Sequence, residues 1–165
     1  MAQVDFFLKI DGIDGESQDG KHANEIQVLE WNFGETQGGT HSAGGGGGAG
    51  KVVMQDFHFR MLTNKASPKL FLACANGEHI KTAKLTCRKA GKEQQEFLTW
   101  SFSDLLVSSY QTGGSDTGPA GGVQPTDSIS LNFTKVEIGY KPQKADGTLD
   151  AENKAGYDLK KNQKV

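Results

Sequence analysis

The sequence has 165 residues, about the length of one domain, and a net charge of −2 at pH 7. This balance gives no electrostatic support for a nucleic-acid partner, and no apolar run is long enough for membrane insertion. The 22 glycines and nine phenylalanines favour strands joined by tight turns. We therefore expect a single domain over residues 1–165.

Two strands and a turn are predicted at the start of the chain. Residues 3–10 alternate between apolar and other side chains, which is typical of a half-buried strand. Residues 11–20 are rich in Asp and Gly and predict a turn. Ile26–Phe33 form the second strand, and its apolar parity changes near Val28–Leu29. A β-bulge would explain that change, because one extra residue reverses the inward face.

The end of the second strand has two different faces. We expect Trp31 and Phe33 on the buried face, and Glu30 and Asn32 on the opposite face. In a monomeric barrel this second face meets solvent, whereas in a ring-shaped assembly it can line a central channel.

A glycine-rich insertion follows at residues 35–50 and contains five consecutive glycines, Gly44–Gly48. We expect a flexible loop there, because glycine accepts backbone angles that other residues avoid. Lys51–Arg60 is predicted as a strand, with Val53 and Phe57 on the same face.

One helix is predicted, beginning at Ser67-Pro68. Ser67 suits the N-cap and Pro68 the first helical position, whereas Gly77 suits the C-terminal cap. The apolar residues that share a face of this helix are Leu70, Phe71 and Cys74.

Four more strands are predicted, at His79–Lys89, Glu96–Phe102, Leu105–Thr112 and Thr126–Tyr140. In the first of them the alternation places Ala83, Leu85 and Cys87 inward, and Lys84, Thr86 and Arg88 outward.

Irregular segments separate and follow these strands. A flexible loop is expected over residues 113–125, and a parity change predicts a bulge near Thr134–Lys135. Residues 142–165 are polar and include a candidate closing strand at Gly156–Asn162. The sum is a mainly β domain, an antiparallel β-barrel or sandwich with one lateral α-helix.

One segment resembles part of a phosphate-binding loop. Gly45–Lys51 reads G-G-G-G-A-G-K, but the next residue is Val52 instead of the Ser or Thr that holds magnesium. The segment also precedes a strand, whereas a phosphate loop leads into a helix whose N-terminus binds the anion. We therefore expect no nucleotide cofactor.

Catalytic and metal motifs are also lacking in the sequence. The histidines His22, His41, His58 and His79 have no metal-like spacing, and we expect ordinary surface or interface residues. Ser17 has no nucleophile-elbow context, so Glu16 and Ser17 are expected to cap a turn. Cys74 and Cys87 are expected as reduced, buried small residues, although the sequence leaves a disulfide open.

A series of segments in fixed order resembles the haemolysin-coregulated protein family, the tube subunits of bacterial type VI secretion. The series begins with D-F-F-L-K-I-D-G-I-D-G-E-S, I-Q-V-L-E-W-N-F-G and G-G-G-G-G-A-G-K-V. It continues with Q-D-F-H-F, S-P-K-L-F-L-A-C-A-N-G, A-K-L-T-C-R-K-A-G, L-L-V-S-S-Y-Q-T-G-G and Y-K-P-Q-K-A-D-G. Each segment alone is weak, but their number and order cover nearly the whole chain.

The resemblance implies a structural protein without catalytic residues, cofactor or metal. Its fold resembles that of phage tail-tube proteins, and its subunits form a hexameric ring. The rings stack into a hollow tube that a contractile sheath surrounds and a spike protein tips. The tube is expelled from the cell and carries small effector proteins in its lumen. This implies assembly in the cytoplasm followed by secretion, and the first residues show no cleaved signal pattern.

Two sets of residues are candidates for these contacts. The ring-stacking candidates are Gly44, Gly45, Gly46, Gly47, Gly48 and Lys51, within the Gly38–Gly50 loop and just after it. The candidate lumen and effector contact is Asn32. The alternative function is a monomeric β-barrel module that binds a small ligand, and a hydrolase based on Ser17 has no motif behind it.

Overall fold

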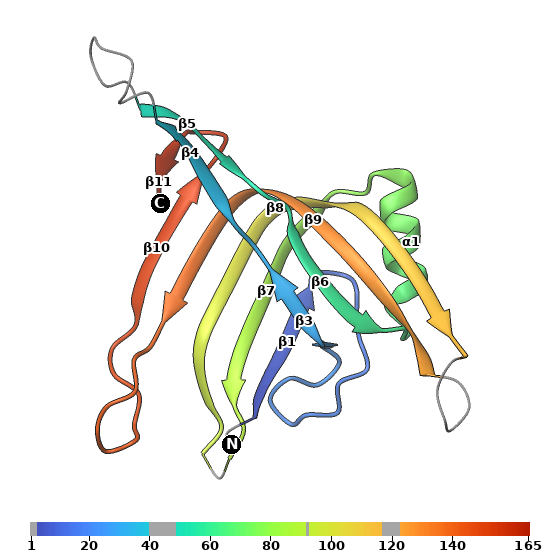
Figure 1. The fold of residues 1–165 in the computed structure, drawn as a ribbon, viewed down its shortest axis with the longest axis horizontal. Coiled ribbons are helices and arrows are strands. Elements are labelled where there is room, and N and C mark those ends of the chain that lie inside the picture. Colours follow the sequence, from blue (N-terminus) through green and yellow to red (C-terminus); the bar gives the residue numbers. More distant parts are fainter. Residues whose placement is uncertain (1–2, 40–48, 92, 117–122) are drawn as a thin grey trace.

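The computed structural model describes residues 3–39, 49–91, 93–116 and 123–165. Its elements, in chain order, are β1 (Val4–Ile10), β2 (Ile26–Val28), β3 (Glu30–Asn32), β4 (Glu35–Gly39), β5 (Ala49–Met54), β6 (Phe57–Leu62), α1 (Ser67–Asn76), β7 (Ile80–Lys89), β8 (Gln95–Ser115), β9 (Val123–Tyr140), β10 (Asn153–Asp158) and β11 (Gln163–Lys164). A mainly β, antiparallel fold with one lateral helix is therefore confirmed within these ranges (Figure 1).

The main sheet is antiparallel and has the strand order β11-β10-β9-β8-β7-β1-β2. β9 also pairs with β6, and β6 pairs with β3, so the sheet curves round on itself. β8 and β9 form a long bent hairpin across the molecule (Figure 1). This hairpin supplies strands to both sides of the barrel, and α1 lies at its side.

The bend in this hairpin corrects two predictions. The two strands expected between residues 96 and 112 are one continuous strand, β8. Its backbone turns at Asp104, which has a positive φ of 50°. At this bend the core-facing residues switch from one alternating set to the other in both β8 and β9. The pairing of the two strands therefore continues across Thr134–Lys135 without a register shift. The register shifts lie instead between Val107 and Ser109 and between Gly113 and Ser115.

The core is dominated by aromatic and branched side chains. Phe57, Phe102 and Leu131 are at most 1% exposed, and the rings of Phe102 and Phe133 lie 4.8 Å apart. Burial of each such side chain contributes about 1.5–3 kcal/mol relative to exposure. Trp31 packs partly buried against this core, as its strand position predicts.

The helix begins differently from the sequence prediction. Ser67 is the first helical residue instead of the N-cap, which is Ala66. Leu70 and Ala73 face the core, whereas Phe71 is 59% exposed, so the predicted face is only partly correct. The C-terminal cap is confirmed, because Gly77 has a left-handed φ of 65°.

The chain changes sheet partner where a bulge was expected. β2 pairs with β1, whereas β3 pairs with β6, and the exposed Leu29 lies between the two strands. The parity reversal is confirmed, but its cause is this change of partner strand.

Several loops predicted as irregular are partly ordered into strands. Residues 35–39 and 49–54 pair as the antiparallel hairpin β4–β5. The strand expected at Lys51–Arg60 is two strands in different sheets, so Val53 does not share a face with Phe57. β8 and β9 extend through parts of the expected 113–125 loop. β10 and β11 lie in the polar C-terminal segment.

Candidate assembly surfaces

The β4–β5 hairpin is a separate two-stranded sheet, which we call the arm (Glu35–Gly39 and Ala49–Met54). It extends beyond the body of the molecule (Figure 1). Gly50 is required in it, because a Cβ at this position would lie 2.6 Å from the carbonyl oxygen of Gly38. Lys51 is exposed on β5, whereas the predicted contacts Gly44–Gly48 lie outside the described residues.

The two faces of the arm differ in what they contact. Val52 and Met54, both partly buried, line a hollow that also includes Tyr157 from β10. Lys51 and Val53 occupy the alternate positions of β5, and Val53 is 65% exposed. One face of the arm therefore turns toward the body, and the other is left to solvent.

A second surface, which we call the polar face, lies outside the core on β3, β6, β8 and β9. Asn32 is exposed there and pairs in register with His58 on the neighbouring strand. The Ser109 hydroxyl donates a hydrogen bond to Ser130 at 2.7 Å, and Ser130 lies 2.5 Å from Nδ1 of His58. The shallow groove along this face has a volume of about 340 Å³. Asn32 thus lies on a polar, hydrogen-bonded surface, as its strand position predicts.

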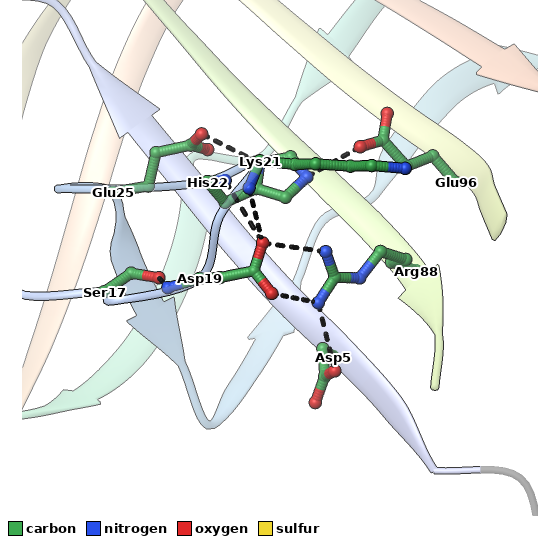
Figure 2. Close-up of polar contacts among 8 residues, drawn as sticks. All are labelled: Asp5, Ser17, Asp19, Lys21, His22, Glu25, Arg88 and Glu96. Atoms are coloured by element: carbon green, nitrogen blue, oxygen red, sulfur yellow. Dashed lines mark hydrogen bonds and ion pairs between the residues drawn. The ribbon is translucent and has the colours of Figure 1, made fainter. Parts of the chain in front are cut away.

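A third region is an internal anchor that holds the segment 11–25 against β1 and β7 (Figure 2). The Arg88 guanidinium donates two hydrogen bonds to the Asp19 carboxylate, at 2.9 and 2.6 Å. These bonds hold the pKa of Asp19 well below its ordinary value, against the opposing effect of burial. Arg88 also lies 4.8 Å from the ring centroid of Phe7.

His22 belongs to the same anchor. Its Nδ1 is 2.8 Å from Glu25 and its Nε2 is 2.7 Å from Glu96, so both ring nitrogens face carboxylates (Figure 2). An ionised carboxylate only accepts hydrogen bonds, so a ring nitrogen bonds to it as an N–H donor. The ring also stacks on Phe7 with centroids 4.5 Å apart.

The anchor corrects three sequence predictions. Arg88 was expected to point to solvent, and His22 was expected as a surface or interface residue, but they are only 2% and 6% exposed. Thr86, also expected outward, is 3% exposed. The cause is segment 11–25, which covers the outer face of the strands. No local pattern in the sequence signals this cover.

Asp127 is a second buried charged group that the sequence analysis missed. It is fully buried and accepts hydrogen bonds from Ser67 at 2.5 Å, Thr63 at 2.9 Å and Tyr110 at 3.1 Å. Burial acts to raise the pKa of Asp127, but hydrogen bonds from hydroxyl groups, Ser67 and Thr112 first, outweigh it and lower the pKa. The carboxylate therefore joins the start of α1 to the barrel.

The serine and cysteine side chains considered as reactive groups in the sequence analysis lie in turns, in the core or against it. Ser17 is nearly buried, and its hydroxyl accepts the backbone N–H of Asp19 at 3.3 Å, in keeping with a turn. Cys74 and Cys87 are free, and burial raises the pKa of Cys87 to about 12. Within the described ranges, no group of three or more His, Cys, Asp and Glu is arranged to hold a metal. No helix in these ranges is long and apolar enough to cross a membrane.

Comparisons with known proteins agree with this architecture. The family model described as "Type VI secretion system effector, Hcp" matches residues 7–140. Protein hcp1 of Pseudomonas aeruginosa is 47% identical over 161 residues, which cover 96% of this chain and 97% of the relative.

Two solved structures are similar over their full length. Hcp1 from Salmonella typhimurium is 37% identical, with 100% of both chains covered and a TM-score of 0.78. A type six secretion system protein is 29% identical, with 99% of this chain and 100% of the other covered and a TM-score of 0.91.

Proposed function

The chain belongs to the Hcp family of type VI secretion proteins, and from that premise we propose that it is the structural subunit of the secretion tube. In this proposal six copies form a ring, and rings stack into a hollow tube. The protein then acts through its surfaces and its copies instead of through a catalytic centre.

The observation that carries this proposal is the arm. A two-stranded hairpin that leaves the body of its own subunit keeps exposed strand edges and an exposed apolar side chain, Val53. Such edges invite pairing with other chains, and natural proteins cover or block them. Contact with a neighbouring copy covers them in an assembly, and Lys51 is the described member of the stacking contacts that we propose.

A ring also requires a particular kind of interface. A contact between two different surfaces of identical subunits closes into a ring when its rotation closes. The chain presents several different surfaces, including the arm and the polar face, on different strands. Two different surfaces of this kind can meet between identical subunits, as a ring-closing interface requires.

We assign the polar face to the lumen of the tube, with Asn32 as the residue that contacts cargo. Hydroxyl, amide and imidazole groups dominate this face, and its ion pair between Arg60 and Glu30 is 3.1 Å long. A hydrated surface with few unpaired charges suits the passage of small effector proteins, because it offers hydrogen bonds without a large apolar patch.

The remaining partners follow from the same proposal. A contractile sheath surrounds the tube and a spike protein covers its tip. The tube assembles in the cytoplasm and is then expelled to the exterior.

The test is the mass of the purified protein in solution by light scattering, with electron microscopy of the same fractions. We expect six times the chain mass and rings with an open centre. A stable monomer at high concentration, with no rings in any fraction, would contradict the proposal. That outcome would leave a monomeric ligand-binding barrel as the explanation.

A further inference from the structure

A groove at one side of the barrel collects exposed apolar side chains. Val4, Leu29 and Leu62 are 39%, 46% and 39% exposed, and all three line the same groove of about 330 Å³. They come from the beginning of β1, the junction of β2 and β3, and the end of β6. Large apolar residues gathered at a groove mark a binding surface more often than scattered ones do.

The groove also has an acidic margin. Asp5 and Glu16 line it, and Asp5 lies 3.7 Å from the buried Arg88. Glu16 is exposed, and no ion pair joins it to another charged group in the described parts of the chain. The groove therefore combines an apolar wall with a free negative charge.

The outer face of the arm has the complementary chemistry. Val53 is 65% exposed, the most of any large hydrophobic residue in the described ranges. Lys51 lies two positions earlier on the same face, and among the described residues it has no acidic partner. An apolar side chain and a cation thus lie side by side on a strand with exposed edges.

The arm and the groove lie at different ends of the molecule (Figure 1). The arm extends beyond the top of the ribbon, whereas β1 begins at the bottom and β6 ends at the lower right. The arm of one chain therefore points away from its own groove. A second copy of the chain can supply the missing arm.

We propose that the arm of one copy docks into this groove of another copy, with Val53 against Val4, Leu29 and Leu62, and Lys51 beside Glu16. This docking rests on the proposed tube function and specifies which surface receives the arm when rings stack. Because the two surfaces differ and lie at opposite ends, each copy can give an arm to one neighbour and receive one from another.

The first experiment is a charge exchange, measured as the concentration at which rings stack in electron microscopy and sedimentation. Lys51→Glu and Glu16→Lys alone are each expected to raise that concentration at least about tenfold. The double variant Lys51→Glu/Glu16→Lys is expected to recover most of the loss. Lys69→Glu, which changes an exposed lysine of α1 outside both surfaces, is the matched control and should stack normally.

The second experiment traps the contact directly. Chains carrying Val53→Cys are mixed with chains carrying Leu29→Cys, both in a Cys74→Ser background, and then oxidised. Only a contact between copies can link these two chains, so a disulfide-linked pair is expected on a non-reducing gel. Val53→Cys mixed with Phe71→Cys should give no such pair, although Phe71 of α1 is 59% exposed and therefore more accessible than Leu29.

The outcomes separate the docking surface from the tube function. Normal stacking by both single charge variants, failure of the double variant to recover, or absence of the Val53–Leu29 crosslink in stacked rings would overturn the docking surface and leave the tube proposal intact. Wild-type protein that forms neither rings nor stacks would contradict both. Circular dichroism of each variant establishes that lost stacking is not lost folding.

Discussion

The segment 11–25 and the arm are both long connections between strands of the main sheet. The side chains of segment 11–25 find their partners within the same chain, whereas those on the outer face of the arm stay exposed. Segment 11–25 folds onto its own barrel, where Asp19 meets Arg88, and His22 lies between two carboxylates. The arm leaves its barrel and keeps Lys51 and Val53 exposed. The difference is that between a connection completed within one chain and one that needs another copy.

The comparison separates two kinds of energetic effect. Changes in segment 11–25 or its anchor should lower the free energy of unfolding of a single subunit. Changes on the outer face of the arm should leave that free energy nearly unchanged, because the exposed Val53 buries little surface within its own chain. Such changes should instead weaken association between copies.

Removal of Arg88 is the largest expected effect. Arg88→Ala leaves the Asp19 carboxylate without the partner that donates its two hydrogen bonds. Breaking a buried ion pair by removing one member typically costs about 3–5 kcal/mol. We expect a loss of that size in denaturant-induced unfolding, against a change within about 0.5 kcal/mol for Lys84→Ala at an exposed position of the same strand. Equal stabilities of the two variants would show that segment 11–25 is not held by this pair.

Removal of Asp127 is expected to cost somewhat less. Asp127→Ala leaves the hydroxyl groups of Ser67, Thr63 and Tyr110 without their acceptor, and a hydrogen bond to a charged group contributes about 1.5–3 kcal/mol. The measurement is again the free energy of unfolding. The control is Asp146→Ala, which removes an exposed carboxylate that accepts hydrogen bonds from the nearby Thr148. A similar loss of stability in this control would contradict the role of Asp127 in holding α1 against the barrel.

Both buried charges show where sequence reasoning stops. The inward positions Ala83, Leu85 and Cys87 were predicted from alternation along a single strand and are confirmed. The same alternation gave the wrong result for Arg88. It assumes that one face of the strand is exposed to solvent, whereas segment 11–25, distant in sequence, covers that face. Asp127 was missed for a related reason: its partners Ser67, Thr63 and Tyr110 come from other elements of the chain, and no spacing in the sequence brings them together.

The longer elements were easier to predict than their junctions. The helix, its glycine cap and most strands follow from local composition and periodicity. The continuous bend of β8 lies at Asp104, a non-glycine residue at positive φ whose neighbours Ser103 and Leu105 both pair with β9. Asn32 was placed correctly on an exposed face, but its proposed contact with cargo depends on other molecules.

Acid should weaken the anchor in a defined direction. The folded pKa of Asp19 lies below the ordinary value of about 3.9, so its ionised form stabilises the protein above that pH. The contribution is lost as the pH falls from about 4 through the folded pKa. Unfolding of Asp19→Asn should therefore depend less on pH below about 4 than wild type does, whereas Asp14→Asn serves as an exposed control in the same segment. Identical pH profiles of Asp19→Asn and wild type would contradict this role.

Val53→Ser has the smallest expected effect on the single subunit and the clearest effect on assembly. Val53 is exposed and lies on the face of the arm that turns away from the body, so its free energy of unfolding should change by no more than about 0.5 kcal/mol. Stacking of rings should nevertheless weaken, because the apolar contact with a neighbouring copy is lost. Leu72→Ser, which removes an apolar side chain of α1 that is 57% exposed, should alter neither property much. If Val53→Ser lowered the free energy of unfolding as much as Arg88→Ala does, Val53 would stabilise its own subunit. The contrast between the arm and segment 11–25 would then be wrong.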